Sequence, residues 1–249
     1  QGVGGPQCNG PRVVGDGRGE PIHPVVRVAA VQESVRVARR KLQRAVEVEM
    51  PALALTDHDA VYGTVRFEQA ARQAGVKPIL GAEITLVNGG GHLTLLAETN
   101  EGYANLCRLI TLARRDQQKG FAALPWRLLA DHHAGLIALS GCRRSEIARA
   151  VLDHHLDKAQ HAGERFASIF GVGNFFLELQ RHHERGDRRL NDGMVALAQR
   201  LRLPLVATGN VHYLDTDDGP IHDVLTCIRQ RLSLTQANDY LRSNHEYHF

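Results

Sequence analysis

The stretch that most constrains this chain is an apolar run that ends abruptly in metal-binding residue types. Residues 52–55 have the length and composition of a buried strand. The residues that follow them directly are Thr56, Asp57, His58 and Asp59. A parallel strand that ends in this way delivers such groups to its carboxyl end, where α/β barrels and open α/β sheets keep their sites. The spacing alone fits equally well a strand followed by a polar turn and a helix N-cap.

Strands and helices alternate along the chain, which favours a mostly parallel α/β architecture. Apolar runs predict strands at residues 52–56, 78–87, 92–97, 135–140, 175–180 and 204–208. Helical periodicity and end signals predict helices at residues 35–48, 60–74, 101–114, 125–131, 145–152, 158–170, 187–201 and 216–230. Right-handed crossovers between these strands would place their carboxyl ends on one side.

Ligand-type residues recur at the ends of the expected strands. His58, Glu83, Cys142 and His212 lie at or near four carboxyl ends, and His92 opens another strand. A histidine near a strand end is more often a hydrogen-bonded structural residue than a ligand. Because four such ends would meet at one rim, the sequence nevertheless favours a site there.

The cysteines and the net charge narrow the classes of protein. Cys8, Cys107, Cys142 and Cys227 form no Cys-x-x-Cys pair, so neither a zinc ribbon nor a disulfide framework is indicated. A reduced, cytoplasmic compartment fits best. The net charge of +3 permits contact with nucleic acid but does not argue for it. No apolar stretch approaches the roughly eighteen residues of a membrane span, so no membrane partner is expected.

Most of the fourteen histidines are expected to be ordinary surface residues. Three adjacent pairs occur in polar stretches, at residues 132–133, 154–155 and 182–183. We expect such pairs to be solvated rather than to bind metal. The arginines of residues 181–189 alternate with acidic residues, which is typical of a solvated face rather than of a phosphate-binding surface.

Residues 1–40 differ in composition from the rest of the chain. Gly, Pro, Val and Arg dominate them, and no period of two or 3.6 residues appears before about Val35. We expect this segment to be poorly structured, and we expect the folded domain to span residues 41–249. The chain starts with Gln1 rather than Met, so its true start is expected elsewhere.

Several motifs agree in order and spacing with one known family. They occupy residues 51–59, 63–67, 77–83, 92–97, 101–106, 140–142, 203–208 and 210–213. On these motifs the chain resembles the PHP (polymerase and histidinol phosphatase) domain. It most closely resembles the PHP domain of bacterial C-family DNA polymerase III α subunits, in particular their error-prone branch. The resemblance implies the distorted (β/α)7 barrel of PHP domains, with metal ligands at one rim.

The resemblance also implies a set of metal ligands. The positions of this sequence that match the family's ligands are His58, Glu83, His92, Cys142 and His212. Imidazole, carboxylate and thiolate groups suit zinc, and zinc or manganese is the implied cofactor. Asp57 and Asp59 flank the motif histidine as outer partners. Asn210 stands where active members usually have Asp, and therefore looks like a degenerate ligand.

The start of the chain departs from the family. PHP domains open with a strand that carries His-x-His, but the only histidine before Pro51 is His23, in a Pro-Ile-His-Pro stretch. The first barrel strand is therefore expected to be missing or distorted, which would leave sheet edges open. Metal binding is expected to be weak or absent. A damaged or mis-read coding region joined to a genuine PHP body is one hypothesis for this start.

The resemblance implies a role within a larger polymerase. The expected function is that of the PHP portion of an error-prone DNA polymerase, acting in DNA replication and damage-induced translesion synthesis. No catalytic residue is assigned, because the ligand set is incomplete and the family's polymerase carboxylates lie in a later domain. The implied partners are DNA, the polymerase core in cis, the sliding clamp and translesion accessory proteins. The alternative is a metal-dependent phosphoesterase or 3′–5′ exonuclease.

Overall fold

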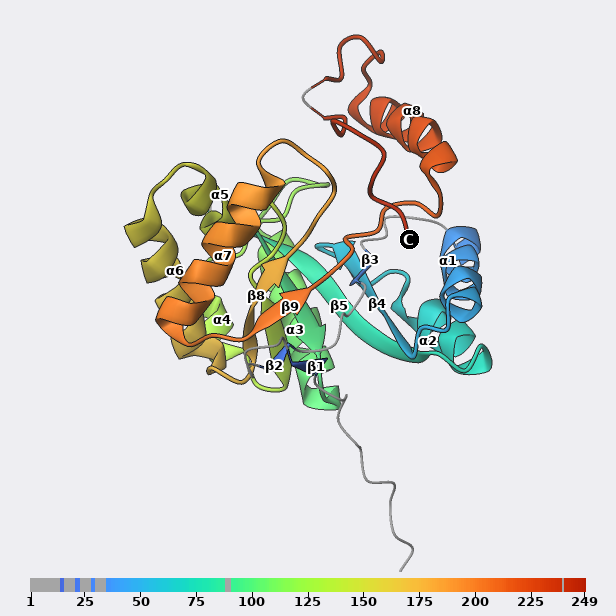
Figure 1. Ribbon diagram of the computed structural model, residues 1–249. Helices are drawn as coiled ribbons and strands as arrows, with labels where there is room; N and C mark the ends of the chain where they lie inside the picture. The colour runs from blue at the N-terminus through green and yellow to red at the C-terminus, as the bar shows by residue number, and fades with distance from the viewer. Residues whose placement is uncertain (1–13, 16–20, 23–27, 30–34, 88–90, 239) are drawn as a thin grey trace, which may run out of the picture.

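The sheet is built from strands that pair in the order in which they occur in the chain. The structure, a computed structural model, describes residues 14–15, 21–22, 28–29, 35–87, 91–238 and 240–249. Its main sheet has seven strands in the order β3-β4-β5-β6-β7-β8-β9. Their bounds are β3 Val28–Ala29, β4 Ala52–His58, β5 Lys77–Leu86, β6 Gly91–Ala97, β7 Leu136–Leu139, β8 Phe175–Leu179 and β9 Leu205–Ala207. Figure 1 shows that this sheet curls, which agrees with a distorted barrel of PHP type.

Strand direction changes only around β6. The pairs β3-β4, β4-β5, β7-β8 and β8-β9 are parallel, whereas β6 runs antiparallel to both β5 and β7. Only residues 87–90 separate β5 from β6, and a parallel pair would need a crossover of a dozen or more residues. The amino end of β6 therefore lies at the same rim as the carboxyl ends of the other strands.

Helices cover the outside of the curled sheet (Figure 1). Their bounds are α1 Val35–Glu47, α2 Thr64–Gln73, α3 Asn100–Arg115, α4 Arg127–Asp131, α5 Glu146–Leu152, α6 Leu156–Phe170, α7 Asp187–Leu201 and α8 Gly219–Gln230. A 3-10 turn, Thr216–Asp218, precedes α8. Helix α8 stands apart from the body at the end of the chain, near α1. No helix of the described residues is long and apolar enough to cross a bilayer.

The apolar core has three parts that follow the two faces of the sheet. The largest part packs helices α3, α5, α6 and α7 against β5 to β8. A second part joins α1 and α2 to β4 through Leu42, Leu53 and Phe67. A third, small part lies on the concave face, where Ala54, Leu96, Leu139 and Val206 meet. Because strand residues alternate between faces, β4 supplies the second and the third part in turn.

The start of the chain contains three two-residue strands among its described residues. Strands β1 (Val14–Gly15) and β2 (Pro21–Ile22) pair with each other, and β3 pairs with the edge of β4. Among the described residues, β3 takes the edge position beside β4 where the first barrel strand is expected. His23 lies outside the described residues, as does most of the segment expected to be poorly structured, so that expectation stays a prediction.

Two expected helices differ most from the structure in their bounds. The helix expected from residue 60 begins at Thr64, because residues 60–63 form a turn that Gly63 closes by donating its N–H to Asp57 Oδ2 at 3.3 Å. The helix expected over residues 216–230 is divided into the 3-10 turn and α8, with Pro220 in the first turn of α8. Proline is favoured there because its missing N–H has no helical partner to lose.

Candidate metal centre

The pairing of β4 and β5 places the first two candidate ligands side by side. The two strands are parallel and in register, so His58 lies opposite Glu83 at the rim. The Nε2 atom of His58 lies 3.4 Å from Oε2 of Glu83. Glu83 is buried, and its carboxylate therefore needs a proton donor or a cation as a partner.

The reversed strand β6 supplies the third candidate. His92 pairs with Thr85, two residues beyond Glu83 on β5, so the side chains of His92 and Glu83 share one face of the sheet. The Nδ1 atom of His92 lies 2.6 Å from Oε1 of Glu83. The rings of His58 and His92 meet edge to face with their centroids 4.6 Å apart.

A tight turn after β7 brings in the thiol of Cys142. Gly141 has a φ of +87°, and a Cβ at this position would lie 2.3 Å from the carbonyl oxygen of His92. Glycine is therefore needed for the close approach of this turn to β6. The Sγ atom of Cys142 donates to Oε1 of Glu83 at 3.4 Å and lies 3.6 Å from Nδ1 of His92.

These side chains form one compact group. Ligand atoms of His58, Glu83 and His92 all lie within 4.8 Å of one another, and Cys142 contacts two of the three. The imidazole, carboxylate and sulfur donors match the ligand types of zinc sites, so a single ion fits this group. The structure therefore brings four of the five predicted ligands together.

The electrostatics of the group centre on Glu83. Burial alone would raise the pKa of Glu83, but the hydrogen bond from His92 and the nearby His58 and His92 outweigh it and lower this pKa to about 2. Burial, followed by the charge of Glu83, raises the pKa of the Cys142 thiol well above its ordinary value. A metal ion would thus meet an ionised Glu83, but it would have to displace the proton of Cys142.

The fifth predicted ligand, His212, lies apart from this group. It follows β9, and its Nε2 atom contacts an Nη2 hydrogen of Arg242. Its backbone N–H donates to the carbonyl oxygen of Tyr247 at 2.8 Å. The Nε2 nitrogen of His212 is therefore already engaged.

The three predicted outer residues have separate roles. Asp59 accepts hydrogen bonds from the N–H and the hydroxyl of Thr85, at 2.8 and 2.7 Å, and so ties the end of β4 to β5. Burial raises the pKa of Asp57 to about 6, against the opposing effects of Gly63 and Lys41. Asn210 donates to Oε1 of Gln180 at 3.4 Å.

A buried carboxylate that the sequence analysis missed supports the turn of Cys142. Glu178, on β8, accepts from the N–H of Gly141 at 3.1 Å and from Gln180 at 2.8 Å, and it also contacts the hydroxyl of Thr208. Burial raises the pKa of Glu178 above its ordinary value. In the sequence this residue reads only as one position of a short strand, so nothing marked it.

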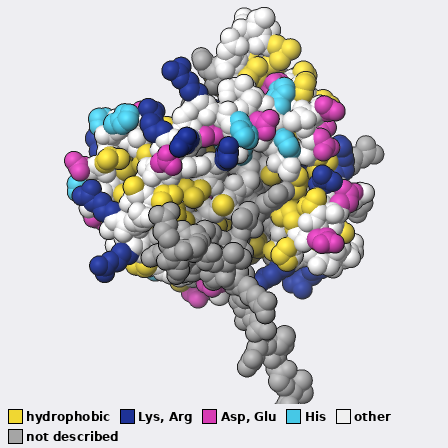
Figure 2. Space-filling view, viewed as in Figure 1, with side chains coloured by type: hydrophobic (Ala, Val, Ile, Leu, Met, Phe, Trp, Pro, Cys, Tyr) yellow, Lys and Arg dark blue, Asp and Glu magenta, His cyan; other side chains and the backbone are white. Residues whose placement is uncertain are grey.

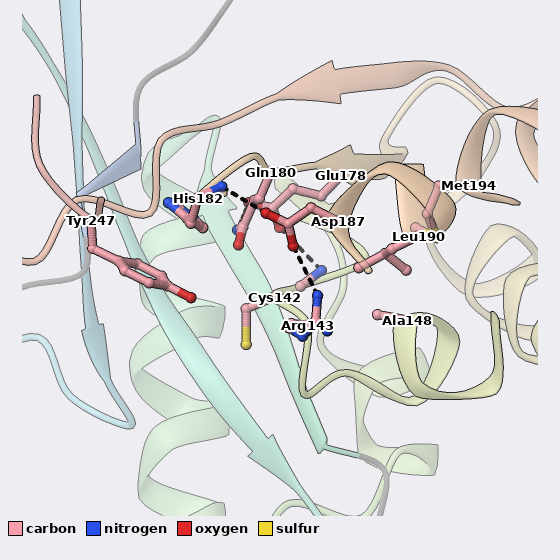
Figure 3. Close-up of a pocket in the computed structure, with 11 residues that line it drawn as sticks. Cys142, Arg143, Ala148, Glu178, Gln180, His182, Asp187, Leu190, Met194 and Tyr247 are labelled. Atoms are coloured by element: carbon pink, nitrogen blue, oxygen red, sulfur yellow. Dashed lines mark hydrogen bonds and ion pairs between the residues drawn. The ribbon is translucent and has the colours of Figure 1, made fainter. Parts of the chain in front are cut away.

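One expectation for the paired histidines is wrong. His182 is not solvated but buried, and its ring stacks on Tyr247 with centroids 3.8 Å apart. Its backbone N–H donates to Asp187, which also accepts from Arg143 at 2.8 Å (Figure 3). The four arginines of residues 181–189 are exposed, as expected of a solvated face.

The metal group opens into a cavity with basic walls. The cavity has a volume of about 540 Å³ and is lined by His58, Glu83, His92, Cys142 and His212. Five arginines also line it, namely Arg143, Arg144, Arg149, Arg229 and Arg242. Figure 2 shows histidine, acidic and basic side chains close together between α8 and the body.

The fold and the site together define a class of protein. A curled, mostly parallel sheet with His, Glu and Cys side chains at one rim is an α/β barrel with a candidate metal centre. The model of one protein family, the PHP domain, matches residues 34–182 of this chain. The chain therefore belongs to the PHP domain family.

Comparison with curated proteins extends this assignment. The chain is 45% identical over 205 residues to an error-prone DNA polymerase of Symbiobacterium thermophilum. This match covers 76% of the chain and 19% of that polymerase. The chain is 38% identical over 203 residues to a DNA polymerase III subunit alpha of Thermus aquaticus, covering 75% of this chain and 16% of that protein. The chain thus spans less than a fifth of the length of these relatives.

A solved structure confirms the fold. An amidohydrolase from Chromobacterium violaceum, solved with bound sulfate, superposes with a TM-score of 0.51 at 15% sequence identity. The match covers 76% of this chain and 87% of that protein. At this identity the likeness concerns the fold alone.

Proposed function

We propose that this chain is the PHP portion of an error-prone DNA polymerase. In this proposal residues 41–249 form the domain, and its role is to support the polymerase core in cis rather than to catalyse a reaction. The similarity to an error-prone polymerase from Symbiobacterium thermophilum supports this assignment. The parent protein would act on DNA in the cytoplasm, in replication and in translesion synthesis, with the sliding clamp and accessory proteins as partners.

The observation that carries the structural role is the size of the ligand group. Among the described residues, one group of three His, Cys, Asp or Glu side chains has ligand atoms close enough to share an ion, and Cys142 lies beside it. Multi-metal phosphoesterases hold ions about 3.5–4 Å apart and need ligands for each. The group of His58, Glu83, His92 and Cys142 is sufficient for one zinc or manganese ion, held weakly.

The cavity favours a second candidate function, a metal-dependent phosphoesterase or 3′–5′ exonuclease. Its five arginines lie around the ligand group, where they would bind the oxygens of a phosphate ester. A bound ion would polarise the ester and lower the pKa of a water molecule. The arginines would orient the substrate, while Glu83 accepts the hydrogen bond from Nδ1 of His92.

Metal content and activity together decide between the two candidates. The purified chain is analysed by plasma mass spectrometry and then unfolded thermally with and without chelator. We expect no more than one ion per chain. Excess zinc at about one hundred times its Kd would stabilise the fold by about 2.7 kcal/mol.

Hydrolysis of a phosphate monoester and of single-stranded DNA is then measured for the native chain and for His58→Ala and Glu83→Ala. We expect that neither substitution changes the rate of hydrolysis, because the native chain does not catalyse it. Two or more tightly held ions, together with hydrolysis that both variants lose, would establish the phosphoesterase instead. Equal hydrolysis in the native chain and both variants would identify a contaminating enzyme and leave the structural role in place.

A further inference from the structure

The contact between Arg242 and His212 bears directly on how this chain binds metal. A neutral imidazole has one nitrogen lone pair, whereas arginine only donates. Because an Nη2 hydrogen of Arg242 meets Nε2 of His212, this nitrogen is the acceptor and the proton of the ring is on Nδ1. The lone pair that receives the guanidinium is the same one that would bind a metal ion.

His212 accepts this contact as a neutral imidazole, because a protonated ring has no lone pair for the guanidinium. Arginine keeps its charge at any pH that the fold survives. The contact is thus a lasting one between a fixed cation and a neutral acceptor.

Several contacts hold Arg242 in place. It belongs to residues 240–249, which we call the C-terminal strap. The guanidinium lies over the ring of Tyr247, 3.7 Å from its centroid. The hydroxyl of Tyr247 donates to Glu184 at 2.7 Å. The backbone carbonyl oxygen of Tyr247 accepts from the backbone N–H of His212 at 2.8 Å. Arg242 is therefore fixed by both the strap and the loop that it contacts.

A second fixed cation supports the same loop from α1. The buried Nζ of Lys41 donates to the carbonyl oxygens of Val211 and His212, at 3.3 and 2.9 Å. A divalent ion at His212 would face both positive charges at short range. Repulsion between like charges in a partly buried site is strong because solvent screens it poorly.

We propose that Arg242 is a built-in competitor of the metal ion for His212, so that the native chain binds metal only through the group of His58, Glu83, His92 and Cys142. The guanidinium occupies, as a permanent cation, the position at His212 that a metal ion would take. His212 then occupies a ligand position in the sequence but does not bind the metal ion. The proposal rests on the metal site of the proposed function.

The test is a double-mutant cycle on zinc affinity, measured by competition with a chromophoric chelator. Arg242→Met removes the donor and the charge but keeps the stem over Tyr247, where sulfur packs well. We expect its zinc affinity to rise on the order of tenfold, the usual size of a ligand-environment effect. Arg115→Met removes an arginine whose side chain is 64% exposed at the end of α3, outside the cavity lining, and is the matched control, expected to leave the affinity unchanged.

His212→Ala completes the cycle. In the native background we expect unchanged zinc affinity, because the ring is not a ligand there. In the Arg242→Met background we expect the gain to disappear. A loss on the order of tenfold in the native background would overturn the proposal, since such a loss is typical of a working ligand environment. This arm decides the question even where Arg242→Met does not fold.

Two further outcomes separate this proposal from the proposed function. If the native chain binds zinc and Arg242→Met binds it with the same affinity, the claim that Arg242 competes for His212 is wrong, but the metal site remains. Failure of both the native chain and Arg242→Met to bind zinc would overturn the competitor and the metal site together. Circular dichroism of each variant confirms that the fold is retained before titration.

Discussion

Glu83 is the residue on which the candidate metal centre depends. It is the anion of the group and contacts each of the other three, at 3.4 Å for His58, 2.6 Å for His92 and 3.4 Å for Cys142. Without its negative charge, two imidazoles and a thiol would share a cavity lined with arginines. The carboxylate therefore offsets much of the positive charge that an incoming cation would meet.

We expect Glu83→Gln to weaken zinc binding on the order of tenfold or more, because an amide carries no charge and is a poor ligand for zinc. Isothermal titration of the purified variant with zinc measures the effect. Glu98→Gln, at an exposed position beyond β6, is the control and should bind like the native chain. Equal affinities for the two variants would show that the ion binds elsewhere.

Four of the five ligands predicted from the sequence lie together in the structure, and His212 lies apart. His58, Glu83, His92 and Cys142 are each placed by a strand end, and strand ends can be read from apolar runs. The engagement of His212 depends on Arg242, a residue of an irregular segment that no periodicity marks. Contacts of this kind follow from the path of a loop, which local patterns do not determine.

At the scale of elements, α1 is tied to the rim by one buried charge. Lys41 is 1% exposed, although lysine is among the residues least often buried. Its ammonium group satisfies two carbonyl oxygens in the loop after β9, far away in the sequence. The sequence predicted the helix from its periodicity but gave no sign that a lysine on it would be buried.

We expect Lys41→Met to lower the free energy of unfolding by about 1–3 kcal/mol, because two buried carbonyl oxygens lose their donor while the apolar stem is kept. For a domain of this size that corresponds to roughly 2–4 °C in Tm per kcal/mol. Thermal and urea unfolding measure the change. Arg40→Met, with a side chain that is 60% exposed, is the matched control on the same helix. An equal decrease in the free energy of unfolding of Arg40→Met would show that the effect comes from a weaker helix α1 rather than from the contacts of Lys41.

At the scale of the whole molecule, three histidines make stability depend on pH. Burial lowers the pKa of His182, of His212 and of His222, and Arg242 lowers each of them further. In the unfolded chain these imidazoles bind protons below about pH 6.5. The unfolded state therefore binds more protons than the folded state below that pH, and acid favours unfolding.

We expect the free energy of unfolding to keep its full value above about pH 6.5 and to decrease as the pH drops toward about 5.5. His182→Gln should show a smaller fall between these pH values, because it removes one of the three groups. Urea unfolding at both pH values gives the difference for each protein. His161→Gln, at an exposed position on α6, should keep the native difference. A fall in His182→Gln as large as in the native chain would contradict the assignment to His182.

The order of strands in the sheet has a consequence for how the chain assembles. Each strand from β3 to β9 pairs with the next one along the chain, so each pairing joins neighbouring segments of the sequence. Such pairings can form before contacts between distant segments, because closing a shorter loop costs less entropy. The contacts of Lys41 with the loop after β9 span 170 and 171 residues and can form only once the last strand is in place. We therefore expect synthesis from the ribosome to build the sheet strand by strand, with the rim around His212 as the last region to become ordered.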